Sequence, residues 1–308
     1  MTQFSRRSNF FLLALFAFFV APALLWSAVP LVLKNPPVRP AGSPVLVWDI
    51  ELELANALPR NFRTTDEPLK VGNGTPATIG LSDLHASGSG EFTADNLKLL
   101  LTRMHGAITI FDLRQETHIF VNGLPVSWFV TRDWANVGRS QTEIEEAEAA
   151  WVQSLRPGSE IAVRPGHAVK EGNAESGVPQ QVIVKEAGNE RDLVSSAGAS
   201  HVRVAVRVLP ENAWAHFHCE AGLGRTTTFM VLYDMLRNAR HVSLEDIVQR
   251  QKLLGYGYDV LGPDGPGNWK APYMEDRIAF VRAFYNYARA NPNGPPQIWS
   301  EWLNSGGQ

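Results

Sequence analysis

Apolar and polar residues follow two periods along this chain, and together these periods predict its secondary structure. Alternating or short apolar runs predict strands at 47–54, 107–113, 201–209 and 214–218. Apolar positions three or four residues apart predict helices at 93–104, 226–236, 243–254 and 273–289, and a further helix that begins at Ser140 with Glu143 at capping-box spacing. Because helices and strands alternate at both ends of the chain, we expect an α/β fold with helices layered on a sheet.

Two stretches modify this picture. Residues 47–54 form a half-buried strand by their pattern, with Asp49, Glu51 and Glu53 on the polar face. Between about 116 and 190, short β-like pieces are broken by Gly and Pro, which indicates a small inserted β-rich domain. A chain of 308 residues is long enough for two such domains.

The first 33 residues have the pattern of a targeting segment. Arg6 and Arg7 precede an uncharged apolar run over 10–33, and Ala21-Pro22-Ala23 offers small residues for cleavage. The run is also long enough to span a bilayer, so a cleaved signal peptide and a retained membrane anchor both remain open. Either interpretation predicts export, to the periplasm or outside the cell, or anchoring at the membrane. Residues 34–56 then form a linker and the first strand.

Composition excludes several classes of protein. The net charge of −3 gives no broad basic surface, so we expect no nucleic-acid partner, and membrane contact only through the N-terminal segment. The chain has 1 Cys, which excludes an intramolecular disulfide and a multi-cysteine metal site. The 8 His are scattered, so we expect no metal and no cofactor.

The single cysteine lies in "HFHCEAGLGRTTTFM", between a predicted strand and a predicted helix. Backbone N–H groups at a helix start lack partners and attract anions. Gly222 and Gly224 allow a tight fold around a tetrahedral anion, and Arg225 can grip two of its oxygens. The same field favours a thiolate at Cys219, and Thr226 is placed to donate to the sulfur. These features predict attack of sulfur on phosphorus. The competing interpretation is a buried structural cysteine beside an ordinary helix start.

The string "HCEAGLGRTT" resembles the active-site loop of the protein-tyrosine-phosphatase superfamily, and most closely that of the bacterial phytases with this fold. The segments "NFRTTDEPL" (61–69), "FDLRQETHIFVNGLPVSW" (111–128), "NWK" (268–270) and "IWSEWL" (298–303) are also similar to that family. The resemblance implies a phosphatase-type central sheet flanked by helices over 57–308, with a small partial β-barrel inserted. It also implies a phosphorylated small molecule as partner, an inositol polyphosphate, and leaves the oligomeric state unknown.

Roles for individual residues follow from the same resemblance. Cys219 would be the nucleophile and Arg225 the phosphate clamp. The phosphate-binding loop would comprise Glu220, Ala221, Gly222, Leu223, Gly224 and Arg225. Arg63, Asp112 and Lys270 match family positions near the substrate, although each could be ordinary surface charge. His218 would order the loop backbone or serve as a core histidine.

The chain departs from the family where the general acid is expected. Related phytases carry an Asp in a Thr-Asp-His stretch after the strand that reads "HVRVAV" here, and this chain continues "RVLPENAWAHFHC" without it. The loop and the helix after it are therefore expected to be deleted, whether in nature or in the sequence record, unless the strand pairs differently. Parallel neighbours need a crossover of about a dozen residues. We therefore expect an antiparallel hairpin around Pro210-Glu211-Asn212, or a displaced strand.

Three functions remain open on this basis. The first is a phosphatase for inositol polyphosphates such as phytate, slowed by the missing acid, with Asp259 or Asp264 as first substitutes. The second is a tyrosine or dual-specificity phosphatase that acts on proteins. The third is a catalytically weak pseudophosphatase that binds phosphorylated ligands.

Overall fold

The structure is a computed structural model that describes residues 37–50, 57–69, 74–171, 177–206, 209–263, 268–291 and 297–305. The chain divides at Pro30 into two units, and all described residues belong to the second, Leu31–Gln308. Among the described residues, no helix is long and apolar enough to cross a membrane. The predicted signal peptide or anchor, residues 1–33, lies outside the described residues.

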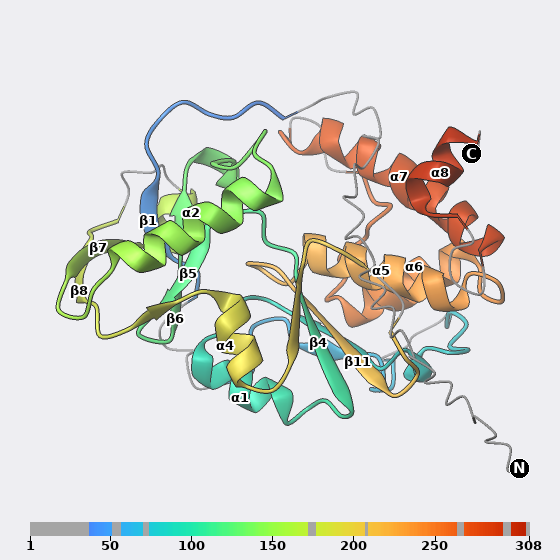
Figure 1. Ribbon diagram of the computed structural model, residues 1–308. Coiled ribbons are helices and arrows are strands. Elements are labelled where there is room, and N and C mark those ends of the chain that lie inside the picture. Colours follow the sequence, from blue (N-terminus) through green and yellow to red (C-terminus); the bar gives the residue numbers. More distant parts are fainter. Residues whose placement is uncertain are drawn as a thin grey trace, which may run out of the picture. The chain divides into compact units, whose positions relative to one another are not determined.

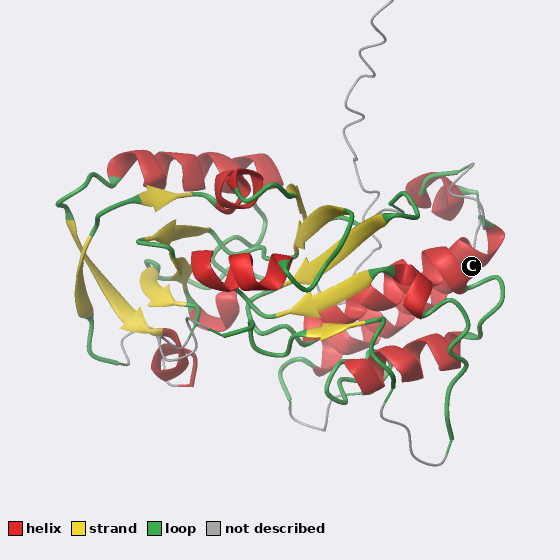
Figure 2. Ribbon diagram, turned by 90° about the horizontal axis from the view of Figure 1, so that it is seen from below, coloured by secondary structure: helices red, strands yellow, loops and turns green. Residues whose placement is uncertain are grey.

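A five-stranded sheet carries the predicted α/β core (Figures 1 and 2). Its order is β10 (Ser200–Arg203), β4 (Ala107–Asp112), β11 (Ala213–His218), β3 (Ala86–Ser89) and β2 (Arg63–Thr64). The first four strands are parallel, and β2 runs antiparallel to β3. The carboxyl ends of β4 and β11 therefore lie side by side, which is where ligands bind in open α/β sheets.

Helices cover both faces of this sheet (Figure 1). One face carries α5 (Gly224–Asn238), α6 (Leu244–Leu254), α7 (Ala271–Ala290) and α8 (Trp299–Asn304), and the other carries α1 (Ala94–Leu101) and α4 (Glu190–Ser196). The sequence alternation explains this layering: Phe111 and Phe217 pack toward α5, whereas Ile110 and Trp214 pack toward α1 and α4. The mixed α/β fold of flanked sheets is thus confirmed.

The β-rich part forms a second, six-stranded sheet. Its order is β8 (Gln180–Ile183), β7 (Glu160–Pro165), β1 (Val45–Trp48), β6 (Leu124–Phe129), β5 (His118–Val121) and β9 (Ala187–Gly188). Trp151 of α2 (Gln141–Ser154) packs in one apolar cluster of this sheet, and Val169 of α3 (Gly166–Glu171) packs in another. Short 3-10 turns occur at Ser82–Leu84 and Thr131–Asp133. The first strand therefore joins the β-rich sheet.

Two predicted strands end earlier than expected among the described residues, and both stop where a polar interaction intervenes. The predicted strand residues 51–54 and 207–208 lie outside the described residues. β1 ends at Trp48, and Asp49 is not on a polar face but buried, with a hydrogen bond from Ser127 Oγ at 2.7 Å. β10 ends at Arg203, because Val204 takes a left-handed φ of 43° and donates its N–H to Asp112 O at 2.6 Å.

The expected hairpin at Pro210-Glu211-Asn212 is wrong. β10 and β11 are both parallel to β4 and lie on opposite sides of it, so they are not neighbours. The described residues of their connection, 204–206 and 209–212, contain no helix. Because β10 and β11 run in the same direction, the connection must return across β4 within residues 204–212, which is shorter than the usual crossover.

Candidate active site

Cys219 lies where β11 ends and the loop to α5 begins, and it is buried. Its Sγ accepts the predicted hydrogen bond from Thr226 Oγ1 at 3.1 Å. The backbone N–H of Gly222 donates to the same sulfur at 3.3 Å. Two donors directed at one sulfur stabilise negative charge on it, which suits a nucleophile better than a structural thiol.

The Cys219 loop (residues 219–225) is held from outside by the segment at 60–63. Three consecutive loop carbonyl oxygens accept from its side chains: Arg60 Nη2 to Glu220 O at 3.0 Å, Asn61 Nδ2 to Ala221 O at 2.8 Å and Arg63 Nη1 to Gly222 O at 2.6 Å. In a trans peptide the C=O and the following N–H point in opposite directions. Fixing the carbonyls outward therefore turns the next N–H groups inward, as the contact from Gly222 N to the sulfur shows.

The loop can fold this tightly because Gly222 has no side chain. Its φ is +77°, and a Cβ there would lie 2.3 Å from the backbone N of Gly90. A left-handed conformation and a backbone contact of this kind both require glycine. Gly224 is the first residue of α5, so the loop enters the helix directly.

Arg225 is held in one orientation by Glu116. Its Nη1 donates to Glu116 Oε2 at 2.7 Å and to Leu113 O at 3.3 Å, and its Nη2 donates to Glu116 Oε1 at 3.0 Å. These contacts use the end of the guanidinium. The Nε–H and the second Nη2–H share the remaining edge. This edge has no hydrogen-bond partner among the described residues, so it can donate to two oxygens of an anion.

A cavity of about 860 Å³ opens above the loop. Cys219, Glu220, Ala221, Gly224 and Arg225 line it, as does the predicted Lys270, whereas Gly222 and Leu223 do not. The other basic side chains in its wall are Arg132, Lys170 and Arg277, and the aromatic ones are Phe129, Trp134, Phe229, Tyr258 and Trp269. Basic residues from several separate elements thus line the same cavity as Cys219, and this arrangement suits a ligand with several anionic groups.

Three carboxyl groups of the described residues also line the cavity, and their ionisation differs. Burial favours the neutral form of Glu116, but Arg225 and Arg114 hold its pKa well below the usual value. Burial acts likewise on Glu220, and Lys170 and Arg60 lower its pKa. Asp133 differs from both, because burial raises its pKa to about 7 against the opposing charge of Lys170.

Two predicted substrate residues lie elsewhere. Arg63 is buried behind the loop, where its second Nη donates to Thr227 Oγ1 at 2.9 Å, so it positions the loop and does not line the cavity. Asp112 is fully buried at the end of β4, where it accepts from Arg114 N at 2.7 Å and faces Arg203 Nε at 3.4 Å. It lines a separate cavity of about 150 Å³.

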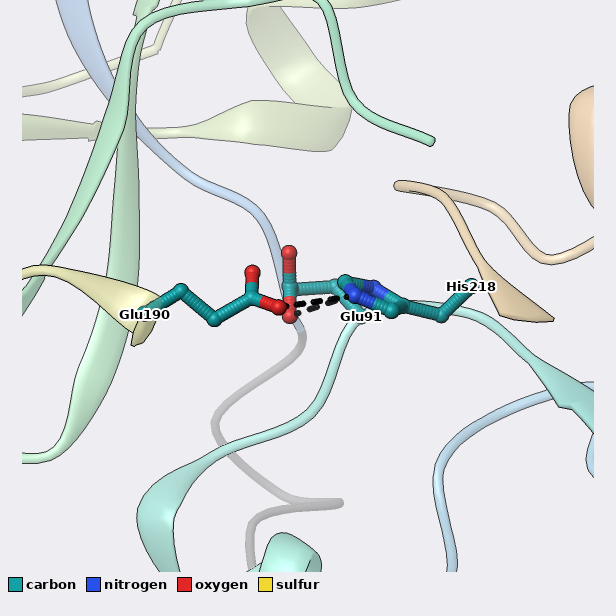
Figure 3. A group of neighbouring side chains, drawn as sticks. All are labelled: Glu91, Glu190 and His218. Atoms are coloured by element: carbon teal, nitrogen blue, oxygen red, sulfur yellow. Dashed lines mark hydrogen bonds and ion pairs between the residues drawn. The ribbon is translucent and has the colours of Figure 1, made fainter. Parts of the chain in front are cut away.

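His218 belongs to a buried ionic cluster behind the loop (Figure 3). Its Nε2 lies 2.9 Å from Glu190 Oε1, and its Nδ1 lies 3.8 Å from Glu91 Oε1. His118 Nε2 contacts the other oxygen of Glu190 at 3.0 Å. Burial lowers the pKa of both imidazoles, but the carboxylates outweigh it and raise each to about 9. The contacts between these imidazoles and carboxylates form an ion-pair brace behind the loop.

Sequence reasoning assigned no role to Glu116, Asp133 or Lys170. Glu116 was visible only as one of several polar residues after a buried strand. Asp133 and Lys170 follow strands of the other sheet, and no motif near Cys219 marks them. Their contribution depends on how the two sheets meet, which residue spacing does not encode.

Comparisons with known proteins agree with this geometry. Residues 199–237 match the family model of PTP-like phytases, whose description is "Inositol hexakisphosphate". The chain is 34% identical over 264 residues to effector protein hopD2 of Pseudomonas syringae pv. tomato. The aligned region covers 78% of this chain and 56% of that protein. It is also 42% identical over 90 residues to the uncharacterized protein AvrBs1.1 of Xanthomonas campestris pv. campestris. That aligned region covers 29% of this chain and 86% of the Xanthomonas protein.

Solved structures are similar as well. The myo-inositol phosphatase of Mitsuokella multacida, in complex with myo-inositol-(1,3,4,5)-tetrakisphosphate, superposes with a TM-score of 0.76 at 34% identity. That match covers 88% of this chain and 50% of the Mitsuokella chain. A PTP-like phytase from Bdellovibrio bacteriovorus superposes with a TM-score of 0.67 at 36% identity, and the match covers 88% of this chain and 100% of the Bdellovibrio chain. The chain thus spans about half the length of the Pseudomonas and Mitsuokella proteins.

Proposed function

Because the chain belongs to the family of protein-tyrosine-phosphatase-like phytases, we propose that it hydrolyses inositol polyphosphates through a phosphocysteine intermediate. One observation carries this proposal. The Cys219 sulfur, with two donors on it and the oriented Arg225 beside it, opens into a cavity walled by basic residues of several elements. A single phosphate fits the loop, while neighbouring phosphates on the same ring meet the other cations.

The reaction has two covalent steps. The thiolate of Cys219 attacks phosphorus, and the loop N–H groups and Arg225 stabilise the charge on the transferring phosphoryl group. Water then cleaves the S–P bond. The first step also expels an inositol alkoxide, which is a poor leaving group without a proton. The chain lacks the Thr-Asp-His stretch in which related phytases carry the acid, so we propose that inositol phosphates, which need a proton donor, react more slowly than activated aryl phosphates.

The aromatic side chains in the cavity wall favour a second candidate, a phosphatase for phosphotyrosine. An aryl phosphate could stack there and would leave more readily than an alkyl one. The basic side chains argue for the inositol substrate. Export of the protein belongs to this proposal too and rests on the sequence of residues 1–33.

The test is phosphate release from inositol hexakisphosphate and from a phosphotyrosine peptide. We expect sequential release from the inositol substrate and weaker turnover of the peptide. Cys219→Ser is expected to reduce kcat on the order of 10⁴-fold or more, since loss of a nucleophile removes the covalent route. Calorimetry should still detect inositol hexakisphosphate binding by this variant, because the loop and Arg225 remain. Turnover that persists in Cys219→Ser would refute the covalent mechanism.

Arg225→Lys tests the anion grip. Lysine keeps the charge but loses the planar fork, so binding and rate are both expected to fall, together by about 10²-fold. The matched control is Arg191→Lys, because Arg191 is exposed and pairs only weakly with Glu145 at 3.3 Å. An Arg225→Lys enzyme with unaltered KM and kcat would contradict the proposed role.

A further inference from the structure

The proposed reaction needs a proton for the leaving oxygen, and three described carboxyl groups lie in the cavity wall: Glu116, Asp133 and Glu220. Glu116 is committed to the two-point pair with Arg225. Glu220 pairs with Arg60 and lies 3.3 Å from Lys170 Nζ. Both are held as carboxylates by these cations, so neither carries a proton to give.

Asp133 is placed differently. Its Oδ1 is shielded from solvent and has no hydrogen-bond partner among the described residues, although the side chain as a whole is 24% exposed. Its Oδ2 lies 4.0 Å from Lys170 Nζ, which is beyond hydrogen-bond distance. The same Lys170 contacts Glu220, the residue after the nucleophile. Asp133 thus lines the same cavity as Cys219, and its Oδ1 has no donor among the described residues.

The backbone also holds Asp133 in an unusual way. Arg132 and Asp133 are consecutive non-glycine residues with left-handed φ values of 67° and 58°. Conformations of this kind persist where the surroundings impose them, and they concentrate at functional sites. Here the Arg132 guanidinium lies 5.2 Å from the Trp134 ring centroid and 4.5 Å from that of Trp269, which anchors the turn in the cavity wall.

We propose that Asp133 is the general acid of this enzyme and replaces the acid that the family carries after β10; the assignment rests on the proposed phosphatase function. In the first step an S–P bond forms, the ester P–O bond breaks, and the Asp133 proton passes to the leaving oxygen to give the free alcohol. In the second step water attacks phosphorus, the S–P bond breaks, and the Asp133 carboxylate takes the water proton. Inorganic phosphate leaves, and Cys219 and Asp133 return to their starting states.

The electrostatic surroundings agree with this role. Burial raises the pKa of Asp133 to about 7, Lys170 and Arg225 oppose the shift, and Glu116 and Glu220 reinforce it. A general acid works best with a pKa near the operating pH. The acid form predominates below pH 7, so activity on poor leaving groups is expected to fall as pH rises through that value.

The experiment is a leaving-group series measured with the full chain. Activated 4-nitrophenyl phosphate, unsubstituted phenyl phosphate, an alkyl phosphate and inositol hexakisphosphate are compared across pH for wild type and Asp133→Asn. Asparagine accepts left-handed φ values, and it retains the size of aspartate but not the proton. We expect a loss of about 10²–10⁴-fold for the alkyl and inositol substrates, less than about tenfold for 4-nitrophenyl phosphate, and no alkaline fall near pH 7 in the variant.

Two further variants separate the other candidate donors. Asp259 pairs with Lys252 at 3.0 Å outside the cavity, so Asp259→Asn should leave the leaving-group dependence unchanged. Asp264, outside the described residues, is tested in the same way. A selective loss in Asp264→Asn or Asp259→Asn, with none in Asp133→Asn, would overturn the assignment.

The controls distinguish failure of the assignment from failure of the phosphatase itself. If wild type hydrolyses these esters and Cys219→Ser does not, but Asp133→Asn retains the wild-type leaving-group dependence, Asp133 is not the acid. If wild type releases no phosphate from any ester, the phosphatase function fails. An Asp133→Asn protein that loses all substrates equally, or no longer binds orthovanadate, has a structural defect, and that result also rejects the assignment.

Discussion

The two walls of the cavity are held together by different kinds of contact. The loop wall, made of the Cys219 loop and Glu116, is closed by hydrogen bonds of 2.6–3.3 Å. The β6 wall, made of residues 131–134 and Lys170, is held by longer ionic contacts of 3.3–4.0 Å and by stacking on tryptophan. An anion site needs fixed donors, whereas a proton donor must change its ionisation. The comparison shows that short hydrogen bonds fix the groups proposed to bind phosphate, whereas longer contacts surround the group proposed to donate a proton.

Gly222→Ala should break the loop wall most severely. The new methyl group meets the Gly90 backbone, and alanine resists the left-handed φ, so we expect a loss of roughly 3 kcal/mol in the free energy of unfolding. Gly138→Ala is the matched control, because its φ is +82° but nothing lies within 4 Å of the added carbon. Gly138→Ala should lower the free energy of unfolding by about 1 kcal/mol. Denaturant unfolding measures both, and equal losses would show that the close contact does not matter.

Glu116→Gln should weaken the loop wall less than Gly222→Ala does, because the protein is expected to stay folded. The amide keeps the shape but loses the charge that orients Arg225, so kcat/KM is expected to fall by about 10–100-fold on every ester, because Arg225 acts on the transferred phosphoryl group. Glu146→Gln, an exposed change on α2, serves as control. A loss restricted to poor leaving groups would instead place Glu116 in the role assigned to Asp133.

Lys170→Met acts on the β6 wall and should have the smallest effect of these three substitutions. Lys170 lowers the pKa of Asp133, so its removal raises that pKa, and the alkaline limb of kcat/KM on inositol hexakisphosphate should move up by about one pH unit. Lys252→Met, which removes the partner of Asp259 outside the cavity, should leave the limb in place. If the alkaline limb of the Lys170→Met variant stays in place or shifts to lower pH, Asp133 does not determine that limb.

The sequence predicted the loop wall far better than the β6 wall. Cys219, the two glycines, Arg225 and Thr226 lie in one short segment, and a strand-loop-helix context fixes their relation. Arg63 was recognised as belonging near the site, but its role as a brace behind the loop required its contacts. Glu116 and Asp133 come from distant segments, and their opposite ionisation follows from neighbours that only the tertiary structure assembles.

The fold was predicted in outline, and its errors have local causes. Helix starts at Thr93 and Ser140 are confirmed with capping boxes, since such caps are read from adjacent residues. The strands at 47–54 and 201–209 were predicted too long because alternation continues past the point where hydrogen bonding stops. The place of β4 between β10 and β11 could not be derived, because strand order depends on pairings between distant segments.

The brace from residues 60–63 to the Cys219 loop also bears on the order of folding events. Its hydrogen bonds join residues 159–164 positions apart in the chain. Contacts of such long sequence separation require closure of a large loop, and they generally form after local helices and turns. A folding chain would therefore acquire the local helix α5 before the Cys219 loop gains its final shape. Recovery of phosphatase activity during refolding is accordingly expected to lag behind recovery of helical circular dichroism.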